Sequence, residues 1–189
     1  IKDKPMNIMR ANFGACVLSG KIYAIGGTTP VPPTTPNSTA PTTKSMEIFS
    51  PNHVGTDGSW TQGTPLPISL GGLCVCAVAA PHRSGNGKIY ALGGFTGDDA
   101  PRHSRAFSYC YDEKTAVWSK IADMTTPRQY ATVSSVPTLG LCVMGGLDLT
   151  TPPGTVLNTV EIWNEGSTSL GTWKNGPNML KPRWRAASA

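Results

Sequence analysis

The heptad KIYAIGG at residues 21–27 returns almost unchanged as KIYALGG at 88–94, and a third near-copy, LCVMGG, stands at 141–146. Each copy is a short apolar run that ends in two glycines. Self-similarity of this kind is typical of a chain built from repeats of one small unit. We therefore predict that the three copies occupy equivalent places in three successive units.

Two further landmarks accompany each copy, always in the same order. Ahead of it, a methionine or leucine is followed four residues later by arginine, or by leucine in the second copy: Met6–Arg10, Leu66–Leu70, Met124–Arg128 and Met179–Arg183. Behind it, an aromatic residue that ends an expected strand is followed by a tryptophan: Phe49 and Trp60, Tyr111 and Trp118, Trp163 and Trp173. The tryptophans are 58 and 55 residues apart, which sets the length of the unit.

One unit contains the pattern of four short strands, which we expect at 12–19, 21–27, 45–50 and 58–64. The first two are apolar on both faces, as are strands sandwiched between layers. The chain has 21 glycines and 17 prolines in 189 residues and no helical periodicity, so the expected fold class is all-β.

The glycine pairs close the second strand of each unit, where they allow positive φ and close backbone approach. They are Gly26 and Gly27, Gly93 and Gly94, and Gly145 and Gly146. A four-stranded sheet of this size cannot bury both faces by itself, so it must stack on neighbours around a ring.

These jointly recurring landmarks resemble those of kelch-repeat β-propeller proteins, over essentially the whole chain. The resemblance implies four-stranded antiparallel blades, with units at residues 10–69, 70–127 and 128–182 and the start of a fourth at 183–189. Three local features depart from the kelch pattern. Leu70 replaces an arginine, HRSGNG at 82–87 lengthens one turn, and the run at 141–144 lacks the usual tyrosine.

Three units are fewer than the 4–8 blades of a closed propeller. Bare blade faces expose apolar surface that a marginally stable domain does not tolerate uncovered. The resemblance implies a ring of six or so blades. We expect the remaining blades to come from the same longer chain, with a second copy or another subunit as the alternatives.

The resemblance also implies where a ligand binds. In kelch propellers, the connections from the second to the third strand and the segments before the first strands share one side, which we call the loop face. The connections in this chain are 28–44, 95–106 and 147–157. The first is rich in threonine and proline, which indicates a solvated insertion, with a polyproline ligand or a modified patch as alternatives.

Three arginines are the leading candidates for contact with a partner, because each stands just before an innermost strand: Arg10, Arg128 and Arg183. Guanidinium groups there could clamp a carboxylate in bidentate fashion, and arginines at this place bind acidic peptides in kelch substrate adaptors. The alternative is structural, with each arginine bonded to backbone carbonyls of a neighbouring blade.

Four further residues join this candidate set. Tyr130 and Trp184 follow two of the arginines closely and could add aromatic contact, as interface hot spots often do. Arg102 and Arg105 lie in the second connection, where they could touch a partner.

The favoured function is therefore a non-catalytic module that binds a protein or an acidic peptide, as a ubiquitin-ligase substrate adaptor or a cytoskeletal or assembly scaffold. The alternative is a carbohydrate-active or redox enzyme like the galactose-oxidase and mutarotase types, with catalytic residues in blades outside this chain. A copper site needs two inward histidines, and the chain has only His53, His82 and His103. We expect no metal or other cofactor.

The composition of the chain indicates which classes of partner it binds and in which cellular compartment it works. The net charge is +5, but the positive residues are scattered, so neither nucleic-acid binding nor a membrane span is expected. Five cysteines without paired spacing favour a reducing, cytoplasmic setting. A single glycosylation sequon at Asn37 leaves an extracellular location open.

Overall fold

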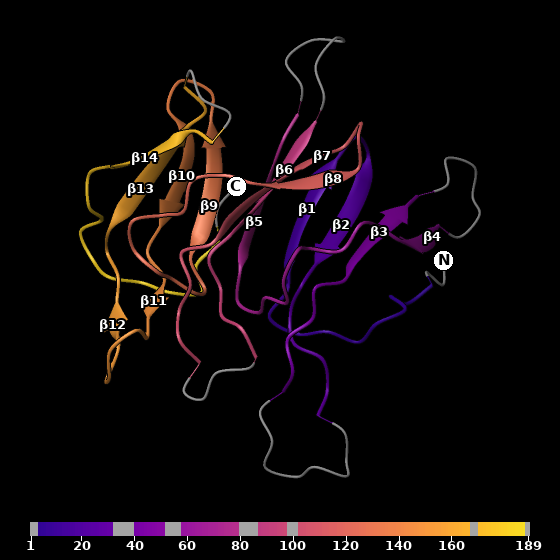
Figure 1. Ribbon diagram of the computed structural model, residues 1–189, viewed down its shortest axis with the longest axis horizontal. Helices are drawn as coiled ribbons and strands as arrows, with labels where there is room; N and C mark the ends of the chain where they lie inside the picture. Colours follow the sequence, from indigo (N-terminus) through magenta and orange to yellow (C-terminus); the bar gives the residue numbers. More distant parts are fainter. Residues whose placement is uncertain are drawn as a thin grey trace.

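The computed structural model describes residues 4–31, 40–51, 58–79, 87–97, 102–166 and 170–187. Within these ranges the chain forms strands and no helix, so no helix there is long and apolar enough to cross a membrane. Three four-stranded antiparallel sheets stand side by side, as Figure 1 shows, and we call them blades 1, 2 and 3. The predicted all-β propeller blades are confirmed.

Each blade runs from an inner to an outer strand. Blade 1 contains β1 (Gly14–Leu18), β2 (Lys21–Ile25), β3 (Met46–Ser50) and β4 (Ser59–Gln62). Blade 2 contains β5 (Cys74–Val78), β6 (Lys88–Leu92), β7 (Ser108–Asp112) and β8 (Val117–Lys120). Blade 3 contains β9 (Thr132–Val136), β10 (Gly140–Met144), β13 (Val160–Asn164) and β14 (Thr172–Asn175). Strands β1, β5 and β9 are neighbours at the inner side.

Two expectations need correction in detail. The first strand begins at Gly14 rather than at residue 12, because Asn12 has a left-handed φ of 53° that interrupts the extended backbone. The connection 147–157 is not a plain loop. It holds a small hairpin, β11 (Leu147–Asp148) paired with β12 (Thr155–Val156), which projects beyond blade 3 in Figure 1.

The tryptophans occupy equivalent places, as the repeat predicts. Each lies directly across from the aromatic residue of the neighbouring strand, in the pairs Phe49 and Trp60, Tyr111 and Trp118, and Trp163 and Trp173. Each indole N–H also donates to a carbonyl six residues before the repeat's arginine position: Lys4 at 3.1 Å, Thr64 at 2.9 Å and Ala122 at 2.7 Å. The tryptophan thus ties its blade to the chain that enters it.

The glycine pairs join one blade to the next. The second glycine of each pair donates its backbone N–H to a carbonyl at the arginine position of the following unit: Gly27 to Leu70 at 2.8 Å, Gly94 to Arg128 at 2.8 Å and Gly146 to Arg183 at 2.9 Å. A Cβ on Gly93 would lie 2.3 Å from the Arg128 carbonyl oxygen, and its φ is +66°. Only glycine allows this approach.

A second backbone series runs along the inner rim. Gly72 N–H donates to the Asn12 carbonyl, Tyr130 N–H to the Gly72 carbonyl and Arg185 N–H to the Tyr130 carbonyl, at 2.7–2.9 Å. All four residues have a φ between 53° and 63°. Left-handed backbone is costly for a bulky residue, so Tyr130 and Arg185 are held there by the series, which fixes the directions of their side chains.

Candidate functional site

The loop face is the lower side of the molecule in Figure 1, where the second-to-third connections of all three blades project. On it lie Thr28, Phe95 and Leu147, the first residues after the glycine pairs. Each forms a β-bridge to the residue after an arginine position: Thr28 to Ala11, Phe95 to Gly71 and Leu147 to Gln129. These bridges hold the connections against the segments that carry the predicted arginines.

Arg10 does not face a partner, because its guanidinium is fully buried in blade 1. It donates to the carbonyls of Gly26 at 2.8 Å and Ser45 at 3.1 Å, to Ser45 Oγ, and to the Glu47 carboxylate at 2.6 Å. Glu47 also accepts from the backbone N–H groups of Asn7 and Ile8. The arginine therefore serves its own blade, which corrects its place among the partner-binding candidates.

Arg128 repeats this arrangement in blade 3. Its guanidinium, likewise unexposed, donates to the Gly145 carbonyl at 2.7 Å, to both oxygens of Thr159 and to Glu161 at 2.7 Å. Burial by itself would raise the pKa of Glu161, but hydrogen bonds from Thr125 and Arg128 outweigh it and hold the pKa below its ordinary value. Arg128 therefore also leaves the proposed binding surface.

Blade 2 shows what happens without the arginine. Leu70 takes its place, and Tyr109 stands where the other blades have Glu47 and Glu161; both side chains are buried in one apolar cluster. Pro67 replaces Asn7 and Thr125, so no backbone N–H at that position requires a carboxylate. The Arg–Glu pairs of blades 1 and 3 and the Leu70–Tyr109 pair of blade 2 thus fill the same place in the repeat, one with an ion pair and the other with apolar side chains.

Arg183 differs from the two buried arginines in being exposed. Its backbone makes the contacts of the repeat, since it accepts from Gly146 N–H and donates to the Leu157 carbonyl. Its guanidinium has no hydrogen-bond or ion-pair partner within the described ranges. Arg183 opens the fourth unit, of which this sequence holds residues 183–189, so strands equivalent to those around Arg10 and Arg128 are not part of it, and its contact with a partner stays a prediction.

Next to Arg183 lies a stack of rings and cations, which we call the arginine–aromatic ladder. It consists of Arg102, Phe95, Tyr130, Trp184 and Arg185. Arg102 lies over the Phe95 ring at 4.7 Å, and ring centroids are 6.0 Å apart for Phe95–Tyr130 and 5.8 Å for Tyr130–Trp184. Arg185 lies over both Tyr130 and Trp184, at 4.7 and 4.5 Å. The stack joins blade 2 to the segment after blade 3.

The ladder gathers three predicted residues, Arg102, Tyr130 and Trp184, and adds Phe95 and Arg185. The sequence carried a signal for both additions. Phe95 directly follows a glycine pair, and Arg185 holds the repeat position of Asn12 and Tyr130. Arg105 lies further along the same connection, bonded to Thr96 Oγ1 at 3.1 Å and 5.8 Å from the Phe107 ring.

The blade 2 connection and the β11–β12 hairpin are joined beside this ladder. Ser104 Oγ donates to the Leu147 carbonyl at 2.8 Å and accepts from Leu149 N–H at 3.0 Å, and His103 Nδ1 lies 3.2 Å from the Leu149 carbonyl oxygen. Asp148 Oδ1 accepts hydrogen bonds from the Thr150 backbone N–H and hydroxyl. The ladder thus brings arginine and aromatic side chains together, and Asp148 is a carboxylate of the adjoining hairpin.

Groups that could support catalysis are dispersed. No three histidine, cysteine or acidic side chains in the described ranges come together in a way that could hold a metal ion. His53, His82 and the Asn37 sequon lie outside those ranges. Burial raises the pKa of the Cys74 thiol to about 12, and of Cys16, with a contribution from Cys76, also to about 12. These two thiols are therefore poor nucleophiles.

Comparisons with known proteins agree with this geometry. The Kelch motif family model matches residues 9–67 and 79–125, more than half of the chain. Kelch-like protein 25 of Xenopus tropicalis is 30% identical over 145 residues, which cover 77% of this chain and 22% of that protein. The solved structure of YjhT is similar in fold, with a TM-score of 0.60 at 13% identity over 89% of this chain and 46% of that one. This chain thus spans less than a quarter of its curated relative.

Proposed function

Because the chain belongs to the kelch-motif family, we propose that it is a non-catalytic interaction module that binds a protein partner on its loop face. The observation that carries this proposal is the arginine–aromatic ladder. Trp184 is 41% exposed, and Arg183 and Arg185 are exposed beside it. Tryptophan, tyrosine and arginine are the residues in which interface binding energy concentrates.

The charge of this surface favours an acidic peptide. Arg185 has no carboxylate partner among the residues the structure describes, and its stack on Tyr130 and Trp184 fixes it in place. A guanidinium held by aromatic rings loses little conformational freedom when it binds, and its fork of donors matches a carboxylate. An acidic side chain on the partner would therefore find a preorganised site.

The proposal of a specific cellular role rests only on membership of the kelch-motif family. A substrate adaptor for a ubiquitin ligase, or a cytoskeletal or assembly scaffold, fits a chain related to kelch-like protein 25. We place the protein in the cytoplasm, as expected for cysteines that are all free thiols. Fluorescence imaging of the tagged protein would test this location. Signal in the endoplasmic reticulum, or secretion of the protein into the medium, would contradict it.

Binding of acidic peptides tests the proposed function. Fluorescence anisotropy with a labelled glutamate-rich peptide should show affinity that falls as salt rises. Trp184→Ala and Arg185→Ala should each weaken it at least tenfold, about the loss of one hot spot. Lys114→Ala, which removes an exposed cation from the β7–β8 turn, is the matched control and should bind normally.

Two results would count against this surface. If the wild type and both ladder variants bound the peptide equally well, the binding site would lie outside the ladder. If Lys114→Ala lost as much affinity as the ladder variants, the peptide would be recognising the overall positive charge of the protein and not the ladder.

A further inference from the structure

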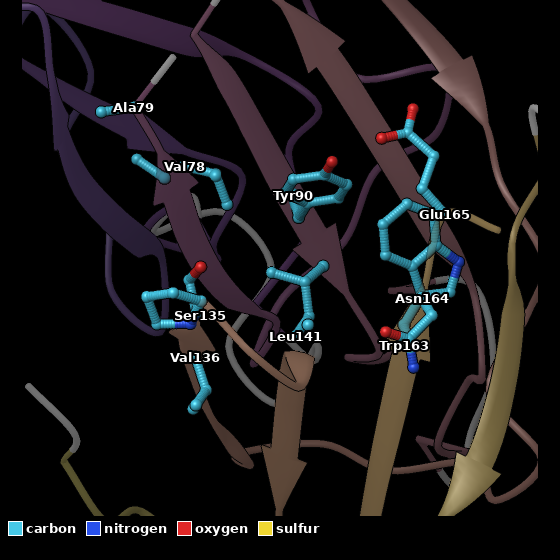
Figure 2. A pocket seen from close by; sticks show the side chains of 12 residues that line it. Val78, Ala79, Tyr90, Ser135, Val136, Leu141, Trp163, Asn164 and Glu165 are labelled. Atoms are coloured by element: carbon cyan, nitrogen blue, oxygen red, sulfur yellow. The ribbon is translucent and has the colours of Figure 1, made fainter. Parts of the chain in front are cut away.

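A cavity of about 520 Å³ lies between blades 2 and 3, on the side away from the loop face. Figure 2 shows its walls. Val78 comes from β5, Val136 from β9 and Leu141 from β10, while Tyr90 and Trp163 supply aromatic rings. Glu165 and Asn164 lie at the polar end of the same view. This volume is in the range of small-molecule sites, which are mostly apolar with a few fixed polar groups.

The repeat provides an equivalent position between blades 1 and 2 for comparison. Leu18 occupies the position of Val78, is only 3% exposed, and packs over Gly87. Val78 is one methylene shorter and half-buried. At this position the side chain is therefore larger and buried in one interface, and smaller and partly exposed at the cavity in the next.

The hydrogen bonds at the rim also differ between the two interfaces. Between blades 1 and 2, Glu113 accepts hydrogen bonds from Ser19 Oγ at 2.7 Å and from the Tyr23 hydroxyl at 3.1 Å. Its equivalent, Glu165, faces Ala79 in place of Ser19, so one donor is missing. Glu165 is bonded through Oε1 to Lys88 at 2.6 Å, and Oε2 has no partner within the described ranges.

The walls indicate the kind of ligand. Tyr90 and Trp163 stand with ring centroids 5.3 Å apart and planes at 54°, an arrangement that a third ring can extend. The Trp163 N–H already donates to the Leu170 carbonyl. Within the described part of the chain, Glu165 Oε2 is a free acceptor at the rim, beside the polar side chains of Asn164 and Ser135. Since Lys88 compensates the charge of Glu165, a neutral ligand fits better than a cation.

We propose that this cavity binds a compact, neutral aromatic molecule that carries one N–H or O–H donor for Glu165. The ring would lie between Val78 and the Tyr90–Trp163 pair, and the donor would point to the rim. The cavity is separate from the arginine–aromatic ladder, so a test of ligand binding in the cavity does not depend on the proposed function.

Indole and 1-methylindole are matched probes, because they share the ring and differ in the N–H. Ligand-observed NMR titration of the whole chain should show indole binding several-fold more tightly than 1-methylindole. Val78→Phe should weaken indole at least tenfold by filling the space, and Glu165→Ala should abolish the preference for indole. Val117→Leu, at an exposed position of β8 outside the cavity, is the control and should leave binding unchanged.

The outcomes separate clearly. Failure of indole to bind the wild type up to its solubility limit would overturn the proposal, as would binding that survives both Val78→Phe and Glu165→Ala. If Val78→Phe does not fold, Glu165→Ala decides, because the Glu165 side chain is 57% exposed and we expect its loss to leave the fold intact. Trp184→Ala should retain indole binding, and loss there would assign the probe to the ladder.

Discussion

At the scale of single residues, the arginine position of the repeat depends on its partners in the blade. Arg10 and Arg128 are buried because each finds a glycine carbonyl, a Ser or Thr oxygen and a glutamate within its own blade. The residues that would correspond to these partners for Arg183 are not part of this sequence, which holds only 183–189 of the fourth unit. For Arg10 and Arg128, burial thus depends on the strands of the blade that each arginine opens.

Replacement of Arg128 by leucine should lower the free energy of unfolding by about 3–5 kcal/mol, the cost of leaving one member of a buried ion pair without its partner. Arg183→Leu removes the equivalent but exposed side chain and should change it by less than about 0.5 kcal/mol. Urea denaturation followed by tryptophan fluorescence measures both. Similar values for the two variants would contradict the structural assignment of Arg128.

The glutamates also predict a pH dependence. For Glu47, too, burial opposes the hydrogen bonds from Arg10 and Asn7, and the net result is a lowered pKa. A carboxyl whose pKa is lower in the folded state contributes stability above its unfolded pKa of about 4.3 and loses it as pH falls through the folded value. The thermal midpoint should therefore fall below about pH 4.3. In Glu161→Gln the acid drop should be shallower, and an unchanged slope would refute the link.

At the scale of elements, the glycine pairs connect blades through backbone hydrogen bonds that no side chain could make. Gly94 N–H reaches the Arg128 carbonyl of the next unit only because Gly93 brings the backbone within contact of that same oxygen. The spacing of the repeat places this contact once per unit. Blade stacking is therefore encoded partly in the main chain.

Gly93→Ala should destabilise the fold by more than about 2 kcal/mol, since it combines left-handed strain of about 1 kcal/mol with a collision against backbone. Gly20→Ala is the matched control, because Gly20 also has a positive φ of 73° but no atom within 4 Å of the added Cβ. It should cost only the strain. Thermal unfolding of the two variants gives the comparison, and equal shifts would show that the collision is relieved elsewhere.

At the scale of the whole molecule, equivalent apolar residues are buried in one blade and open in another. Ile22 of blade 1 is 40% exposed, whereas its counterparts Ile89 and Leu141 are 0% and 2% exposed between blades. Phe13 is likewise open while Leu73 is buried. We propose that a further blade covers this face, from the same longer chain in preference to a second copy or another subunit.

Ile89→Ala should cost about 2–5 kcal/mol in this chain, as expected for a buried isoleucine, and Ile22→Ala less than about 1 kcal/mol. If a further blade packs on blade 1, Ile22→Ala should become as costly as Ile89→Ala in a longer protein that contains this chain. Denaturant unfolding of both lengths measures this. An Ile22 variant that stays nearly neutral in the longer protein would exclude a blade on that face.

Much of the fold can be predicted from the amino-acid sequence, for a local reason. Strand alternation, the glycine pairs and the paired aromatic residues act over a few neighbours, so the pattern places Trp60, Trp118 and Trp173 correctly. It misses the β11–β12 hairpin, because two-residue strands leave too short a pattern. For the candidate site, the predicted residues Tyr130, Trp184 and Arg102 lie together in one cluster. Phe95 and Arg185 are not among the predicted residues, although their places in the repeat mark both, because only the folded chain shows that their side chains stack on Tyr130.

The sequence by itself determined the repeat, the four-stranded unit and the residues that recur in it, because these depend on backbone periodicity and on glycine's freedom. Only the tertiary structure decided which arginines are buried, since Glu47 and Glu161 lie on strands far along the chain from Arg10 and Arg128. It also decided where a cavity opens between blades. That depends on how Val78 and Leu18 pack against a neighbouring sheet, which no local pattern records.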